Sequence, residues 1–161
     1  EELKMLRCNE KTWSDIVLPD GGTKLLDCVV GDSCELEIAV DPGSAGQCGV
    51  KVRTSPGGEE STLLYYDAAA KQLCFDSTHS GIDGRRTLER APFSLKDGER
   101  LRLRVFVDKS VVEVYANDRQ AICRRVYPGR PDSLAVALFA TGGEARFASV
   151  KAWEMMPSNP Y

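Results

Sequence analysis

Few residues of this sequence have the type and spacing that catalysis by side chains requires. The single histidine, His79, lies in the polar stretch Ser77–Ser80. A multi-histidine metal site is therefore excluded, and a Ser-His-Asp or Cys-His site would have to use His79. Two other interpretations are a solvated loop histidine and a histidine that contacts a sugar or a neighbouring domain.

Carboxylates are the other candidates for chemistry, because two of them held across a pocket can hydrolyse a glycosidic bond. The adjacent pairs Glu1-Glu2 and Glu59-Glu60 do not meet that requirement. Neighbouring residues on a strand point to opposite faces, and in a loop they are solvated. The sequence also lacks the GxGxxG, P-loop, GxSxG and HExxH motifs. We therefore predict no catalytic residue, no metal and no cofactor for this chain.

The cysteines lack the CxxC spacing of zinc and thioredoxin-like sites. Most of them lie in apolar runs, so we expect small buried side chains rather than disulfides. One pair is the best candidate for a bridge, because Cys28 and Cys34 bracket a turn at Gly31-Asp32 and would face each other across a hairpin. The full set is Cys8, Cys28, Cys34, Cys48, Cys74 and Cys123.

Four further residues could contact a carbohydrate or a neighbouring domain. Trp13 lies among polar residues near the amino terminus, where an exposed indole could stack on a sugar face. Arg102 and Arg104, together with Arg100, line one face of a predicted strand. This face is either exposed to solvent or a surface that binds an acidic partner. Glu113 points away from the apolar neighbours in its own strand, so it faces solvent or a partner domain.

Length and composition are those of one globular domain. The 161 residues, 42% hydrophobic and 28% charged, suffice for a core, and we expect a single domain over residues 1–161. Residues 1–12 would form a connecting segment and the first strand. Residues 81–161 carry 14 basic and 10 acidic side chains, which is not basic enough to predict nucleic-acid binding. No apolar run approaches the roughly 20 residues that span a bilayer, so we expect no membrane partner.

Hydrophobic periodicity predicts strands almost throughout the chain. In the clearest run, Leu101–Val107, apolar residues alternate with arginines and a phenylalanine. Turn signals rich in Gly, Pro and Asp divide the sequence into about ten to twelve short strands. The longest irregular segment, Ser77–Leu95, is expected to be a loop. The pattern predicts an all-β fold, an antiparallel two-sheet sandwich, and it lacks the helices of an α/β protein.

The segment Leu103–Arg119 is the most informative part of the sequence, with two strands and turns at Asp108–Ser110 and Asn117-Asp118. It resembles the signature hairpin of the C-terminal β-sandwich module of glycoside hydrolase family 32, the family of invertases, inulinases, levanases and other β-fructosidases. At Arg119 and Ser77 the family often has Gly and Arg instead. Other segments extend the resemblance over nearly the whole chain, namely Phe75–Gly81, Arg125–Pro128 and Val150–Met155. Glu2–Arg7 is similar to the segment that joins the catalytic domain to the sandwich in the family.

The resemblance implies a concanavalin A-like jelly-roll sandwich that accompanies a catalytic five-bladed propeller. The family's chemistry uses Asn-Asp-Pro-Asn, Arg-Asp-Pro and Glu-Cys motifs in that propeller, and none of the three occurs here. The implied function is a non-catalytic module that braces a catalytic β-propeller, in cis or in trans, in an enzyme for fructan or sucrose-type sugars. The alternatives are a free-standing, lectin-like carbohydrate-binding module and a homo-oligomerisation domain.

Overall fold

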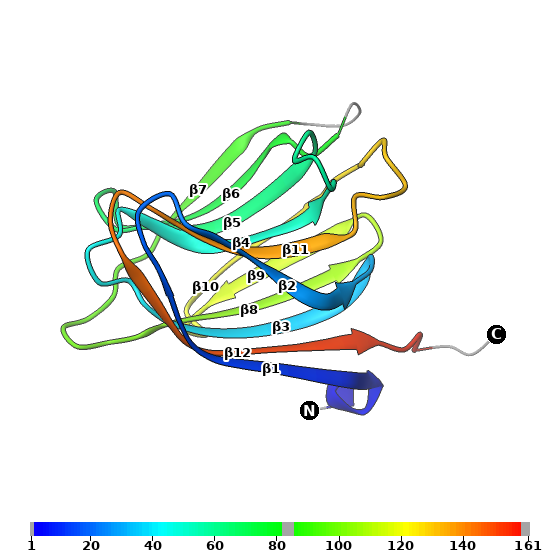
Figure 1. Cartoon of the computed structure of the whole chain (residues 1–161), viewed down its shortest axis with the longest axis horizontal. Coiled ribbons are helices and arrows are strands. Elements are labelled where there is room, and N and C mark those ends of the chain that lie inside the picture. The colour runs from blue at the N-terminus through cyan, green and yellow to red at the C-terminus, as the bar shows by residue number, and fades with distance from the viewer. Residues whose placement is uncertain (1, 82–85, 159–161) are drawn as a thin grey trace.

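The computed structural model describes residues 2–81 and 86–158, and strands account for most of them (Figure 1). Within these ranges the one helix is the five-residue 3-10 helix η1 (Glu2–Leu6), which is too short to cross a membrane. The strands that follow are β1 (Arg7–Leu18), β2 (Thr23–Val30), β3 (Ser33–Asp41), β4 (Gln47–Thr54), β5 (Ser61–Asp67), β6 (Gln72–His79), β7 (Leu88–Pro92), β8 (Leu101–Asp108), β9 (Val111–Ala116), β10 (Gln120–Arg125), β11 (Ala135–Thr141) and β12 (Ala145–Met155).

The strands form two antiparallel sheets that face each other (Figure 1). Sheet A has the order β1-β12-β3-β8-β9-β10, and sheet B has the order β2-β11-β4-β5-β6-β7. This arrangement confirms the predicted all-β, two-sheet antiparallel sandwich. The first strand continues beyond residue 12 and ends at Leu18.

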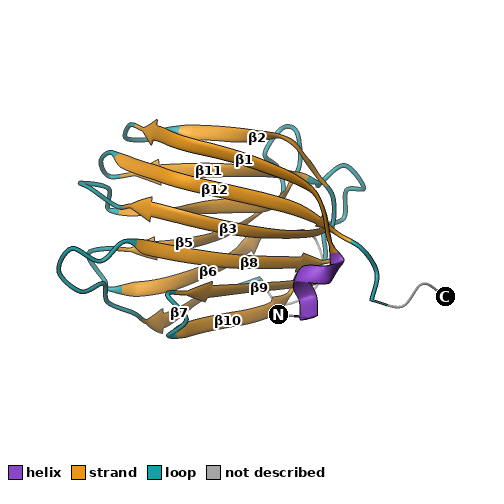
Figure 2. Cartoon of the chain, turned by 90° about the horizontal axis from the view of Figure 1, so that it is seen from below, coloured by secondary structure: helices purple, strands orange, loops and turns teal. Residues whose placement is uncertain are grey.

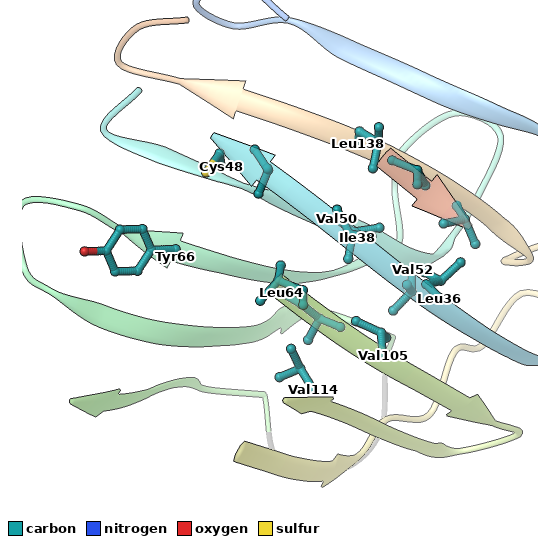
Figure 3. Close-up of a cluster of buried hydrophobic side chains, with 14 of the residues drawn as sticks. Leu36, Ile38, Cys48, Val50, Val52, Leu64, Tyr66, Val105, Val114 and Leu138 are labelled. Atoms are coloured by element: carbon teal, nitrogen blue, oxygen red, sulfur yellow. The ribbon is translucent and has the colours of Figure 1, made fainter. Parts of the chain in front are cut away.

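Apolar side chains at alternate positions fill the space between the sheets (Figure 3). Leu36 of β3 and Val105 of β8 come from sheet A, whereas Val50 of β4 and Leu138 of β11 come from sheet B, and all four are 0% exposed. The predicted alternation of Leu101–Val107 is confirmed, because its aliphatic residues belong to this core. The arginines and Phe106 of the same strand consequently lie on the outer face of sheet A.

The first and last strands of the chain are neighbours in sheet A. Arg7 pairs with Met155 and Leu18 pairs with Ala145, so the start of β1 lies beside the end of β12. Both ends of the described chain therefore leave the sandwich on the same side (Figure 1). Figure 2 shows η1 against the outer face of sheet A, near β8 and β9.

The predicted loop Ser77–Leu95 is wrong in part. β6 continues to His79, and Leu88–Pro92 forms β7, which pairs only with β6 at the edge of sheet B. An edge strand needs hydrogen bonds on one side only, so it tolerates Pro92 and charged residues. These residues interrupt the apolar alternation by which a strand is predicted. Residues 82–85 of this segment lie outside the described ranges.

The proposed hairpin between Cys28 and Cys34 is also wrong. The chain crosses from one sheet to the other at this turn, because β2 belongs to sheet B and β3 to sheet A. Cys34 is a free, buried thiol, and the side chain of Cys28 lies outside the described part of the structure. Burial raises the pKa of Cys34 and of the equally buried Cys48 to about 12, so both stay protonated thiols. The expectation of small buried side chains is confirmed for these two and for Cys74, but it is wrong for the half-buried Cys8 and the exposed Cys123.

Candidate functional site

The outer face of sheet A places an acidic strand beside a basic one. The carboxylates belong to β3. Arg104 belongs to β8, and Arg100 immediately precedes that strand. β3 and β8 pair directly. Arg100 Nε donates to Asp41 Oδ1 at 2.6 Å, and Arg104 Nε donates to Glu35 Oε1 at 2.7 Å. Both arginines are thus paired with carboxylates of the neighbouring strand in the same sheet.

Glu35 is the centre of this charged face. Its side chain is 0% exposed, and it accepts hydrogen bonds from Arg7 Nε at 2.8 Å and Arg7 Nη2 at 2.6 Å, in addition to the bond from Arg104. The Arg7 guanidinium reaches from β1 across β12 and stacks 3.9 Å from the ring centre of Trp153. Burial opposes ionisation of Glu35, but the bonds from Arg7 and Arg104 outweigh it and hold the pKa of this carboxyl below its usual value.

A hollow of about 320 Å³ lies on the same face, beside η1. Ala39 of β3 and Ser149 of β12 have short side chains and leave this space among longer neighbours. Arg102 borders the hollow with its side chain 66% exposed, and its Nη2 is 3.6 Å from Asp118 Oδ2. The other side chains that line it include Lys4, Glu37, Arg104, Tyr115, Asn117 and Lys151. The lining carries four basic and two acidic side chains, so its formal charge is +2.

Three of the five candidate residues from the sequence come together here. Arg102 and Arg104 line the hollow, and Glu113 adjoins it by accepting a 2.9 Å hydrogen bond from the hydroxyl of Tyr115. This bond, helped by partial burial, raises the pKa of Tyr115 above its usual value, so the hydroxyl remains a donor. The Tyr115 ring in turn packs edge-on against Phe106, with ring centres 6.2 Å apart.

The remaining two candidates lie elsewhere. Trp13 of β1 is half-buried and packs against the core between the sheets. His79 is exposed at the end of β6, in sheet B. Sequence reasoning missed Tyr115 and Glu35 as members of the site. The alternation of Glu35 and Glu37 with apolar residues in β3 was the available signal for Glu35, because it places both carboxylates on the face opposite the core.

The turn that follows β9 holds one edge of the hollow in place. Asn117 and Asp118 adopt left-handed backbone conformations with φ of 48° and 54°, and Arg119 N donates to Ala116 O at 3.0 Å. Asn and Asp tolerate this conformation better than other side chains, so the turn forms with arginine where the family often has glycine. The Asn117 amide accepts from Arg102 N at 2.7 Å and donates to Arg100 O at 2.9 Å.

A second buried carboxylate, Glu60, binds the loop that precedes β11 of sheet B. Glu60 is 7% exposed and accepts hydrogen bonds from Gly129 N at 2.8 Å, Arg130 N at 3.2 Å and Ser133 Oγ at 2.5 Å. These bonds tie the loop before β11 to the start of β5. Burial opposes ionisation here as well, and the three donors outweigh it, so the pKa of Glu60 lies below its usual value.

Acid is expected to destabilise the fold through Glu35 and Glu60. Both folded-state pKa values lie below the ordinary 4.5, so their stabilisation is complete above that pH. It is lost as the pH falls from about 4.5 through the lower, folded-state values. Urea unfolding at a series of pH values from 7 to 3 measures the effect, and a Glu60→Gln variant should show a shallower decline. A free energy of unfolding that stays level down to pH 3 would contradict this prediction.

Known proteins are similar to this chain in sequence. The family model described as "Glycosyl hydrolases family 32 C terminal" matches residues 2–154. The levanase of Bacillus subtilis (strain 168) is 33% identical over 171 residues, which cover 98% of this chain and 25% of the levanase. A sucrose-6-phosphate hydrolase of Zymomonas mobilis is 32% identical over 165 residues, which cover 98% of this chain and 31% of that enzyme. The chain therefore spans about a quarter to a third of the length of these curated relatives.

Solved structures share the fold as well. Fructan 1-exohydrolase IIa from Cichorium intybus superimposes with a TM-score of 0.87 at 17% identity, over 99% of this chain and 37% of that one. A β-fructofuranosidase from Aspergillus kawachii superimposes with a TM-score of 0.77 at 26% identity, over 99% of this chain and 30% of that one. Since the family model covers nearly the whole chain and the sandwich agrees with it, the chain belongs to the C-terminal domains of glycosyl hydrolase family 32.

Proposed function

We propose that this chain is the non-catalytic carboxyl-terminal module of a β-fructosidase, an enzyme for fructans or sucrose-type sugars. The observation that carries this proposal is the extent of the match. Residues 2–154 match the C-terminal model of the family, yet they correspond to only 25% and 31% of the levanase and the sucrose-6-phosphate hydrolase. The names of these two relatives support a substrate that contains fructose for the whole enzyme.

The buried carboxylates support a non-catalytic role. Among residues 2–81 and 86–158, the buried carboxylates are Glu35 in sheet A and Glu60, which immediately precedes β5 of sheet B. A glycosidase needs its two carboxyl groups across one pocket, within about 10 Å of each other. Here arginines hold Glu35, and main-chain N–H groups with a serine hydroxyl hold Glu60. Both are thereby committed to structural bonds.

The bracing role rests on the joining segment. Glu2–Arg7 resembles the segment that connects the two domains in the family, and it forms η1 and the first residue of β1. Leu6 O accepts a 2.8 Å hydrogen bond from Met156 N, and Arg7 binds Glu35. A catalytic domain attached before residue 2 would thus be held to sheet A by main-chain and side-chain bonds.

The purified chain is expected to release no fructose from sucrose, inulin or levan. The test is a reducing-sugar assay, with the levanase of Bacillus subtilis on levan as the positive control. Release at rates comparable with that enzyme would overturn the proposed function.

Titration calorimetry with fructo-oligosaccharides separates the module from a free-standing lectin. A bracing module should give no saturable heat. Saturable heat that disappears in a Tyr115→Ala variant would instead assign the hollow on sheet A to carbohydrate binding.

A further inference from the structure

Exposed apolar side chains gather around η1. In the described part of the chain, four of the seven exposed large hydrophobic residues are Leu3, Met5, Tyr115 and Met156, which are 51%, 80%, 37% and 47% exposed. Leu3 borders two hollows of about 510 and 430 Å³, one shared with Tyr115 and the other with Met156. Phe106 lines both of them. The two hollows join Leu3, Phe106, Tyr115 and Met156 into one surface, and Met5 lies on η1 two residues after Leu3. These five residues are here named the η1 patch.

Such a patch differs from ordinary apolar exposure. Single exposed hydrophobic residues are normal on a protein surface, whereas a contiguous group marks an interaction site. The five-residue η1 cannot cover its own apolar side chains, and Met5 is the most exposed of the large hydrophobic residues described. The other exposed ones, Val17, Leu25 and Tyr127, lie on β1, β2 and the loop after β10.

The charged hollow adjoins the η1 patch. Tyr115 belongs to both, and Lys4 of η1 lines the hollow. The ion pair of Arg102 with Asp118 spans 3.6 Å between side chains that are 66% and 84% exposed, so it is weak and can yield to a partner. With a formal charge of +2, the hollow suits a carboxylate side chain from a partner surface.

We propose that the η1 patch and the adjoining hollow are the docking surface for the catalytic domain. This inference rests on the proposed function. Most of each curated relative lies outside the matched 25% or 31%, and the matched model is the C-terminal one, so that remainder precedes the sandwich. Preceding residues would enter at Glu2, the first residue of η1, next to Leu3 of the patch. The facing surface of the catalytic domain is apolar, with a carboxylate opposite Arg102.

Methionine oxidation can test the proposal, because Met5 and Met156 lie in the patch and react with hydrogen peroxide when exposed. The comparison is between the chain alone and a full-length fusion in which it replaces the matched segment of the Zymomonas mobilis sucrose-6-phosphate hydrolase. A Leu25→Met variant of both proteins supplies the matched control. Position 25 lies on sheet B, and its leucine is 51% exposed, the same fraction as Leu3.

In the fusion, mass spectrometry should show Met5 and Met156 oxidised at least about tenfold more slowly than in the chain alone. The methionine introduced by Leu25→Met should react equally fast in both proteins. Arg102→Glu in the fusion should restore part of the Met5 reactivity, with a larger effect at low salt. Unchanged oxidation of Met5, with protection at position 25 instead, would overturn the docking surface and leave the proposed function intact.

Two other outcomes would also decide against the proposal. Equal oxidation of all these methionines in the fusion and the chain alone would count against the bracing role itself. Protection of Met5 that increases with the concentration of the chain alone would assign the patch to a second copy of this chain. Urea unfolding of each variant, with a midpoint close to that of the unmodified protein, serves as the control for folding.

Discussion

Replacing Glu35 by glutamine should lower the free energy of unfolding by about 3 kcal/mol, because removal of one partner from a buried ion pair leaves the other without its counter-charge. The Arg7 side chain is 13% exposed and would remain above Trp153 with its bidentate partner gone. Arg104 is 36% exposed and can turn toward water, which limits the loss. Urea denaturation at pH 7 with an unchanged m-value measures the effect.

Glu37→Gln is the matched control for this prediction. Glu37 lies on the same strand, binds the same Arg7 guanidinium, and has a side chain that is 42% exposed. Exposed ion pairs contribute little, so this variant should lose less than about 1 kcal/mol. Equal losses in the Glu35 and Glu37 variants would show that burial of the carboxylate does not set the strength of the network.

Replacing Asn117 by alanine should cost about 3 kcal/mol, because it removes hydrogen bonds that alanine cannot replace. Asn117 is 6% exposed, and its amide bonds to Arg102 N, to Arg100 O and, at 2.8 Å, to Glu99 Oε1. Alanine would also have to adopt the left-handed conformation with φ of 48°. That conformation adds about 1 kcal/mol for a residue without a suitable side chain.

Two neighbouring variants separate these contributions. Asn117→Gly adopts the left-handed conformation freely but loses the bonds, so it should cost about 2 kcal/mol. Asp118→Ala keeps the amide bonds and carries the backbone strain at a φ of 54°, so it should cost about 1 kcal/mol. If Asn117→Gly proves as stable as the unmodified chain, the amide bonds do not stabilise this turn.

Local patterns in the sequence were sufficient to predict the sandwich fold, but they did not predict every strand. Alternation in Leu101–Val107 and the Asn117-Asp118 turn are short-range signals, and both appear in the structure as predicted. β7 was missed because an edge strand pairs on one side only and therefore tolerates residues that interior strands exclude. The Cys28–Cys34 pairing failed because a turn signal does not tell whether the chain returns to the same sheet.

The candidate site brings together residues that are far apart in the sequence, and no local sequence pattern shows that such residues will meet. Arg102 and Arg104 were identified because period-2 alternation fixes the face on which a strand residue lies. Lys4 reaches the same hollow from the other end of the sequence, and Ser149 approaches it from β12. Glu35 and Arg7 meet across an intervening strand. Such pairings follow from strand order, which the sequence pattern leaves open.

The pairing of the first and last strands has a mechanical consequence. Arg7 lies opposite Met155, so a pull that separates the two chain ends loads the β1–β12 hydrogen bonds in series and opens them one after another. A strand held only in this way would peel off at low force. The Arg7 side chain, however, reaches past β12 to Glu35 on β3. Tension that arrives through η1 is therefore carried into the third strand of the sheet before the main-chain ladder of β1 begins to open.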